Sequence, residues 1–194
     1  LDCRAWAEFM AEHFGPDAKI ILTGISMGAS TVLMAAGEPL PAQVKGVLAD
    51  CGFSSPKAII KEVIRQMKLP SILSYPFVKL GARLYGKFDL EETSPLEMLP
   101  NCKVPVIFFH GEDDDFVPCS MSHENFAACA SRKKLVTVPG AGHGLCIIYD
   151  PEYKGEYDQK LNEGLGISSL AATCLELMGF EAPEGYDPAV MNMK

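Results

Sequence analysis

The chain has 194 residues, of which 48% are hydrophobic and 22% are charged, and its formal net charge at pH 7 is −8. This length suffices for one domain with a sizeable single core, and the composition is that of an ordinary globular protein. The acidic balance argues against nucleic acid or an anionic membrane as the main partner, because both carry negative charge. No apolar run approaches the roughly 18 residues that a membrane-spanning helix needs.

Seven cysteines are scattered along the chain without any Cys-x-x-Cys pairing. Such usage is typical of buried thiols in a reducing compartment, so we expect a cytoplasmic protein. His13, His110, His123 and His143 show no close spacing to cysteine, and we therefore expect no metal site and no cofactor. Because the first residue is Leu1 and not methionine, an upstream targeting signal is left open.

The first fifty residues predict helices that alternate with short buried strands. A helix capped by Asp2 precedes a strand at residues 19–23, and a second helix, closed by Gly37, precedes a strand at residues 44–49. Both strands lack a polar alternation, which is typical of parallel strands buried on two faces. The apolar residues of the first helix recur at helical spacing; they are Trp6, Phe9, Met10 and Phe14.

Residues 53–100 interrupt this alternation. An amphipathic helix is predicted at residues 56–68, and an aromatic, apolar stretch follows in which Pro70 and Pro76 are expected to break regular structure. At about 48 residues, the segment is several times longer than a minimal crossover between parallel strands. We expect part of it to pack on the sheet as a crossover and the excess to form a helical cap over a substrate pocket.

Two further strands are predicted at residues 104–109 and 134–138, with a helix at about residues 120–130 between them. Alternating strands and helices predict an α/β fold with a mostly parallel sheet of at least four strands and flanking helices. Functional residues in such sheets lie on the loops at the carboxyl ends of the strands. Ser26, three consecutive aspartates and His143 all follow predicted strands, so we expect them to cluster.

The pentapeptide Gly24-Ile25-Ser26-Met27-Gly28 lies between the first strand and the second helix. A Gly-x-Ser-x-Gly sequence in that setting is the nucleophile elbow of an α/β-hydrolase. Small residues are expected at Gly24 and Gly28 because strand and helix pass closely there, and the helix directs its first amides at the serine oxygen. The amide of Met27 is the expected first donor of an oxyanion hole.

A serine hydroxyl needs a base to take its proton, and a histidine base needs a carboxylate to orient it. His143, in a glycine-rich loop after the last predicted strand, is the expected base, whereas His110 is expected to be structural. The residues alone leave the acid open among Asp113, Asp114 and Asp115, with Asp50 as a weaker alternative.

Five segments together resemble bacterial α/β-hydrolases of an esterase- and peptidase-like group, over residues 1 to about 153; they are residues 24–28, 49–53, 94–97, 110–118 and 140–144. In that family a loop reads His-Gly-x-x-Asp-x-x-Val-Pro, and its aspartate, the acid of the triad, falls on Asp114. The resemblance likewise implies Ser26 as the nucleophile and His143 as the base. The expected function is a serine hydrolase that cleaves small carboxylic esters through an acyl-enzyme. Peptide, thioester or acyl-transfer chemistry and a non-catalytic scaffold are the alternatives.

The chain departs from that family at both ends. The early strands and the loop that supplies the second oxyanion donor are missing, so we expect one domain, residues 1–194, that is the C-terminal part of a hydrolase. The strand from Lys19 to Thr23 would then be a free apolar edge, open to self-association with another chain. The tail at residues 164–194 is expected to be a packing helix and a loose end, distantly similar to the closing helix of alkaline-phosphatase-superfamily mutases.

Overall fold

The computed structural model describes residues 2–146, 157–158 and 192–193. The chain divides into two compact units, Leu1–Tyr149 and Asp150–Lys194. In the second unit, β5 (Tyr157–Asp158) pairs antiparallel with β6 (Asn192–Met193). The helix expected in the tail falls outside the described residues, and the assignment of residues 1–194 to one domain stays a prediction. No helix in the described part of the chain is long and apolar enough to cross a membrane.

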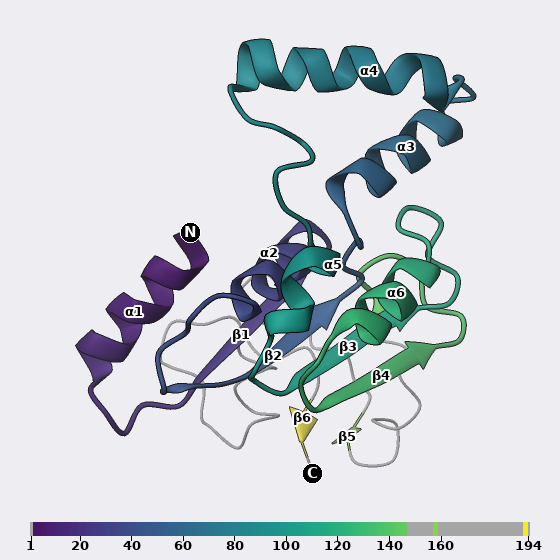
Figure 1. The fold of residues 1–194 in the computed structure, drawn as a ribbon. Coiled ribbons are helices and arrows are strands. Elements are labelled where there is room, and N and C mark those ends of the chain that lie inside the picture. Colours follow the sequence, from purple (N-terminus) through teal and green to yellow (C-terminus); the bar gives the residue numbers. More distant parts are fainter. Residues whose placement is uncertain (1, 147–156, 159–191, 194) are drawn as a thin grey trace. The chain divides into compact units, whose positions relative to one another are not determined.

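The first unit is built on a four-stranded sheet in which every pair of neighbours is parallel (Figure 1). The strands stand in the order β1-β2-β3-β4, and their bounds are Ile20–Ile25, Val44–Asp50, Val106–Gly111 and Lys133–Val138. Helices flank this sheet, so the predicted fold class is confirmed. β1 forms one edge of the sheet, as expected, whereas its pairing with another chain stays a prediction.

The predicted strand bounds are accurate to within two residues, and two of the differences have a local cause. β1 extends past Thr23 to Ile25, because Gly24 and Ile25 still pair with Ala49 and Asp50 of β2. β3 begins at Val106, since Pro105 has no amide hydrogen to give to a ladder.

The helices follow the predicted order, with α1 (Asp2–Phe14), α2 (Met27–Ala36) and α6 (Ser120–Ala128) beside the sheet. The main core lies where α2 and α6 pack on the strands and the short helices α5 (Pro95–Met98) and η2 (Leu99–Asn101) pack against α2 and α6. Its largest fully buried side chains are those of Phe108, Leu33 and Leu99. This core holds the four strands in place, and with them the loops at their carboxyl ends.

The large apolar residues that recur along α1 are not its buried residues. Ala7 and Ala11 are its buried residues, while Trp6, Phe9 and Phe14 are 66%, 52% and 62% exposed. α1 packs on α2 and β1, and a small-residue face allows that close approach. The exposed rings contact one another along the helix, with Trp6 edge-on to Phe9, Phe9 stacked on His13, and His13 edge-on to Phe14.

The insertion between β2 and β3 is helical, as expected. α3 (Pro56–Gln66) begins at Ser55, whose hydroxyl oxygen accepts a hydrogen bond from the Ala58 amide at 3.1 Å. α4 (Ser71–Gly81) then runs into a π-helical turn, η1 (Ala82–Gly86). In Figure 1, α3 leads away from the sheet and α4 lies across its far end.

Pro76 lies inside α4, so the expectation that it breaks the helix is wrong. A proline in a helix has no amide hydrogen to donate, so the carbonyl four residues earlier, here that of Ile72, lacks its hydrogen-bond donor. Ile72 is 84% exposed, so water can take the place of the missing hydrogen bond.

Gly37 ends α2 for a reason that the sequence pattern does not show. Its φ of −84° is ordinary for any residue, so no left-handed conformation requires a glycine there. A Cβ at this position would instead lie 2.3 Å from the Met98 carbonyl oxygen. The missing side chain allows α5 to pack directly on the end of α2.

Gly37→Ala is expected to destabilise the protein by about 1–3 kcal/mol, because the new methyl group would overlap a backbone carbonyl. Gly81→Ala is the matched control, since a Cβ there meets no atom within 4 Å and alanine favours a helix. Urea denaturation followed by circular dichroism measures both variants. Equal midpoints would contradict the packing explanation.

Candidate active site

Ser26 occupies the tight turn between β1 and α2. Its φ of 56° and ψ of −117° are strained for a residue with a side chain. A Cβ on Gly24 would lie 2.3 Å from the backbone of Gly28, so the requirement for a glycine at the first position holds. At Gly28 a Cβ would meet nothing within 4 Å, and the expected steric requirement at that position is wrong.

The amides around Ser26 have two roles. The Ser26 amide donates to the Asp50 carbonyl oxygen at 2.8 Å, which fixes the turn to the end of β2. Met27 is the first residue of α2, and the first amides of a helix have no acceptor within it. The Met27 amide therefore stands beside the serine with the positive end of the helix dipole behind it.

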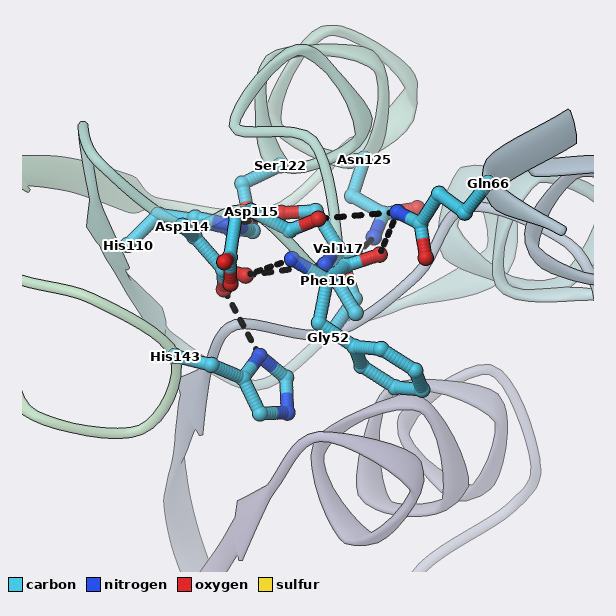
Figure 2. Close-up of polar contacts among 10 residues, drawn as sticks. All are labelled: Gly52, Gln66, His110, Asp114, Asp115, Phe116, Val117, Ser122, Asn125 and His143. Carbon is cyan, nitrogen blue, oxygen red and sulfur yellow. Dashed lines mark hydrogen bonds and ion pairs between the residues drawn. The ribbon is translucent and has the colours of Figure 1, made fainter. Parts of the chain in front are cut away.

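Asp114 and His143 meet in a direct contact (Figure 2). Asp114 Oδ2 lies 2.7 Å from His143 Nδ1, and the Asp114 side chain is fully buried while that of His143 is 27% exposed. An ionised carboxylate can only accept, so Nδ1 carries the hydrogen and Nε2 is left with a free lone pair. This is the tautomer that a general base requires.

The other oxygen of Asp114 shapes its own loop. Oδ1 accepts hydrogen bonds from the amides of Phe116 at 2.9 Å and Val117 at 2.8 Å. Asp113 and Asp115 are exposed, so among the three aspartates Asp114 alone is buried against the histidine. Asp50, the weaker alternative, is also largely buried, and burial raises the pKa of its carboxyl group.

The loops that carry the acid and the histidine interlock at Gly111. A Cβ at Gly111 would lie 2.2 Å from the Ala141 carbonyl oxygen. The same carbonyl accepts the Asp113 amide at 3.1 Å, and the Glu112 amide donates to the Val138 carbonyl at 3.0 Å. The glycine after His110 is thus what allows the histidine loop to reach Asp114.

The histidine loop also lies against the serine turn. A Cβ on Gly144 would lie 3.2 Å from Cγ2 of Ile25, so the residue after the histidine borders the residue before the serine. Within residues 2–146, no hydrogen bond joins the Ser26 hydroxyl to the His143 imidazole. Catalytic hydrogen bonds are often long in unliganded enzymes and tighten when substrate binds.

His110 is structural, as expected, but it also contacts the acid. It is completely buried, with Nδ1 2.6 Å from Ser122 Oγ and Nε2 2.8 Å from the Val117 carbonyl oxygen. A carbonyl only accepts, so Nε2 carries the hydrogen, and it also lies 3.3 Å from Asp114 Oδ2. This contact was not predicted from the sequence, because it depends on how the loop after β3 folds back.

Cys51 was likewise missed. This residue follows β2 with a φ of 47° and is fully buried. Its Sγ lies within 4.8 Å of a carboxylate oxygen of Asp114 and a ring nitrogen of His143. Burial, and then the Asp50 charge, raises the pKa of its thiol to about 12, although the amides of Ser26 and Gly144 act in the opposite direction. A buried thiol that keeps its proton is a poor nucleophile and a poor metal ligand.

Two further features complete the surroundings. The Phe116 ring stands edge-on to the His143 imidazole, with 5.1 Å between ring centroids. Cavities of about 510 and 560 Å³ occur elsewhere in the described part of the chain, and Ser26, Asp114 and His143 line neither. The first is lined by residues around Ser55 and Glu91, and the second by residues around Arg4 and Glu38.

A parallel sheet with a serine elbow, and a buried aspartate and a histidine on its later loops, defines the class of α/β-hydrolases. Residues 1–162 match the prolyl oligopeptidase family, peptidase S9, and the chain belongs to that family.

Two similar proteins illustrate the relationship. The chain is 28% identical over 123 residues to the uncharacterized protein YqkD of Bacillus subtilis, covering 63% of this chain and 40% of that protein. The esterase PF2001 of Pyrococcus furiosus has a similar fold, with a TM-score of 0.56 and 21% identity, over 80% of this chain and 58% of that one. The chain therefore spans less than half the length of the curated relative.

A different protein matches a short segment. The probable 2,3-bisphosphoglycerate-independent phosphoglycerate mutase of Leptospira interrogans is 46% identical over 45 residues, which are 23% of this chain and 8% of that protein. The likeness to mutases inferred from the sequence concerns residues 164–194. All of these except residues 192–193 lie outside the described part of the chain.

In the native protein, Cys51 is expected to resist alkylation by iodoacetamide at pH 8. The thiolate is the reactive form, and a shift of the pKa from 9.0 to about 12 leaves about 10³-fold less of it. The shift also makes the free energy of unfolding fall as the pH rises from 9.0 towards 12, because the unfolded thiol loses its proton first.

Mass spectrometry of the alkylated peptides measures the rate for each cysteine. Cys3 is the internal control, since it is only partly buried and lies on α1. Cys51 should react as fast as Cys3 once urea unfolds the chain. A native rate equal to that of Cys3 would contradict the shielded environment.

Proposed function

We propose that this chain carries the catalytic residues of a serine hydrolase that cleaves small carboxylic esters. The observation that supports this most is the 2.7 Å contact between the buried Asp114 and His143, on a loop that borders the Ser26 turn. Family membership supports hydrolysis in general. On cysteine usage alone we also propose a cytoplasmic location.

In the proposed reaction, Ser26 Oγ attacks the ester carbonyl carbon while His143 Nε2 takes the hydroxyl proton. Asp114 holds the ring through Nδ1 and stabilises the imidazolium that forms. The Met27 amide donates to the developing oxyanion, and a second donor from outside the described residues completes the hole. The imidazolium returns its proton to the leaving alcohol, and water then hydrolyses the acyl-enzyme by the same steps.

Ester cleavage is preferred to the alternatives on a physical ground. Expelling an alcohol asks less of the general acid than expelling an amine, because an alkoxide is the better leaving group and needs less proton transfer in the transition state. Peptide, thioester and acyl-transfer reactions use the same three side chains, so assays with each kind of substrate are needed to distinguish them from ester hydrolysis.

Labelling with a fluorophosphonate probe tests whether Ser26 is activated. The probe reacts with an activated serine, so the unmodified chain should be labelled and the Ser26→Ala variant should not. Fluorescence after gel electrophoresis gives the extent of labelling. Absence of label in both proteins would contradict the proposal and favour a non-catalytic scaffold.

The acid is tested by hydrolysis of p-nitrophenyl esters of increasing chain length, with a p-nitroanilide for comparison. Asp114→Asn is expected to lower kcat by about 10⁴-fold, because a neutral amide cannot stabilise the imidazolium. Asp113→Asn and Asp115→Asn remove a carboxylate from the same loop but at exposed positions, and should change kcat by less than about twofold. A similar loss in all three variants would contradict the role of Asp114.

A further inference from the structure

The insertion exposes an apolar stripe along α4 and η1. Its members are 52–84% exposed, and they are Ile72, Leu73, Phe77, Leu80 and Leu84. Their spacing places them on one side of a helix. Tyr75, the buried residue of α4, lies on the opposite side, where the Lys57 and Lys61 side chains approach its ring. The stripe is therefore the outer face of α4 and not the face that packs on α3.

Positive charge is concentrated in the same segment. Residues 56–88 contain seven Lys and Arg residues and a single acid, Glu62, a net charge of +6. Because the whole chain carries −8, the remaining residues together carry −14. Residues 56–88 are thus a basic, apolar part of the insertion, whereas residues 89–100 add four acids, so that residues 53–100 as a whole carry +2.

The ends of the stripe carry the exposed lysines. Lys79 and Arg83 pair with Asp89, which neutralises part of the charge. Lys68 precedes α4 and Lys87 follows η1, both are exposed, and no ion pair involving either occurs among the residues that the structure describes. The apolar stripe is thus bounded at each end by a lysine that can meet an external anion.

We propose that this surface, the five stripe residues with Lys68 and Lys87, docks on an anionic lipid bilayer. A bilayer offers negative headgroups and, directly beneath them, apolar chains. The stripe side chains can enter the acyl boundary while the lysines stay at the headgroups. The acidic remainder of the chain is repelled by the same membrane, which favours an orientation in which the insertion alone touches it.

A second copy of the chain fits this surface less well. An amphipathic helix that docks on a protein needs an apolar groove. Charged side chains interrupt the lining of both cavities described above; they are Lys57, Glu91 and Glu97 in one and Asp2, Arg4, Glu38 and Glu92 in the other. Two copies of the stripe surface would also bring like charges together. This inference concerns binding and does not depend on the proposed ester hydrolysis.

Co-sedimentation of the 194-residue chain with lipid vesicles tests the proposal. Vesicles of phosphatidylcholine alone are compared with vesicles that contain about one third phosphatidylglycerol. Binding is expected to be at least about 10-fold stronger to the anionic vesicles and to weaken as NaCl is added. Equal binding to both vesicles, or binding to neither, would overturn the proposal.

Variants identify the surface. Phe77→Ser with Leu80→Ser, and Lys68→Glu with Lys87→Glu, are each expected to weaken anionic binding by roughly 10-fold or more. Phe14→Ser on α1 and Lys103→Glu are the matched controls, as exposed residues outside the insertion, and should bind like the unmodified chain. Circular dichroism checks that each variant is folded.

Two results would contradict the assignment of this surface. One is an equal loss of binding in the control variants. The other is a concentration-dependent oligomer that the Phe77→Ser, Leu80→Ser variant abolishes in light scattering, because the occupant would then be a second copy.

Discussion

The carboxylate of Asp114 is the interaction on which the candidate site depends. Removing an ionised carboxylate from water is unfavourable unless both of its oxygens find donors. Here Oδ1 takes the amides of Phe116 and Val117, and Oδ2 faces His143 and His110. The bonds that make burial tolerable also fold the loop and orient the imidazole. A substitution of Asp114 would therefore change both the conformation of its loop and the proposed catalysis.

The insertion is tied to the same loop. Gln66 at the end of α3 donates to the Asp115 carbonyl oxygen at 2.8 Å, as Figure 2 shows. Ile59 of α3 packs with Val117 and Met121 in a small buried cluster. The base of the insertion is thus part of the support for the acid loop, while α4 and η1 carry the exposed surface. Within one insertion, α3 supports the acid loop, and α4 with η1 is exposed.

Local patterns predicted the parts of the structure that local forces determine. Apolar runs gave the strands, and the Gly-x-Ser-x-Gly spacing gave the turn at Ser26. The spacing of Trp6 and its aromatic neighbours predicted the α1 helix, but the buried face is made by the small residues Ala7 and Ala11, which hydrophobicity alone does not identify. The contacts of Cys51 could not be predicted, since they depend on how β1, β2 and two loops meet in space.

The ends of the strands show why the candidate residues adopt their unusual conformations. The residue directly after each of β1, β2 and β3 donates its amide to a carbonyl of the neighbouring strand: Ser26 to Asp50 and Glu112 to Val138, each the last residue of its strand, and Cys51 to Phe109 within β3, at 2.8, 3.0 and 2.9 Å. The sheet ladder thus continues one residue beyond each strand.

At the first two of these positions the chain must also turn away from the sheet. Ser26 and Cys51 do so with φ values of 56° and 47°, a conformation that costs about 1–3 kcal/mol for a residue with a side chain. The hydrogen bond from its amide to the neighbouring strand holds each residue in this conformation. The parallel register, which brings Ile25 beside Asp50 and Asp50 beside Phe109, therefore places the Ser26 turn next to the Cys51 turn. The strain at the proposed nucleophile is a consequence of the sheet, and a local sequence motif alone could not maintain it.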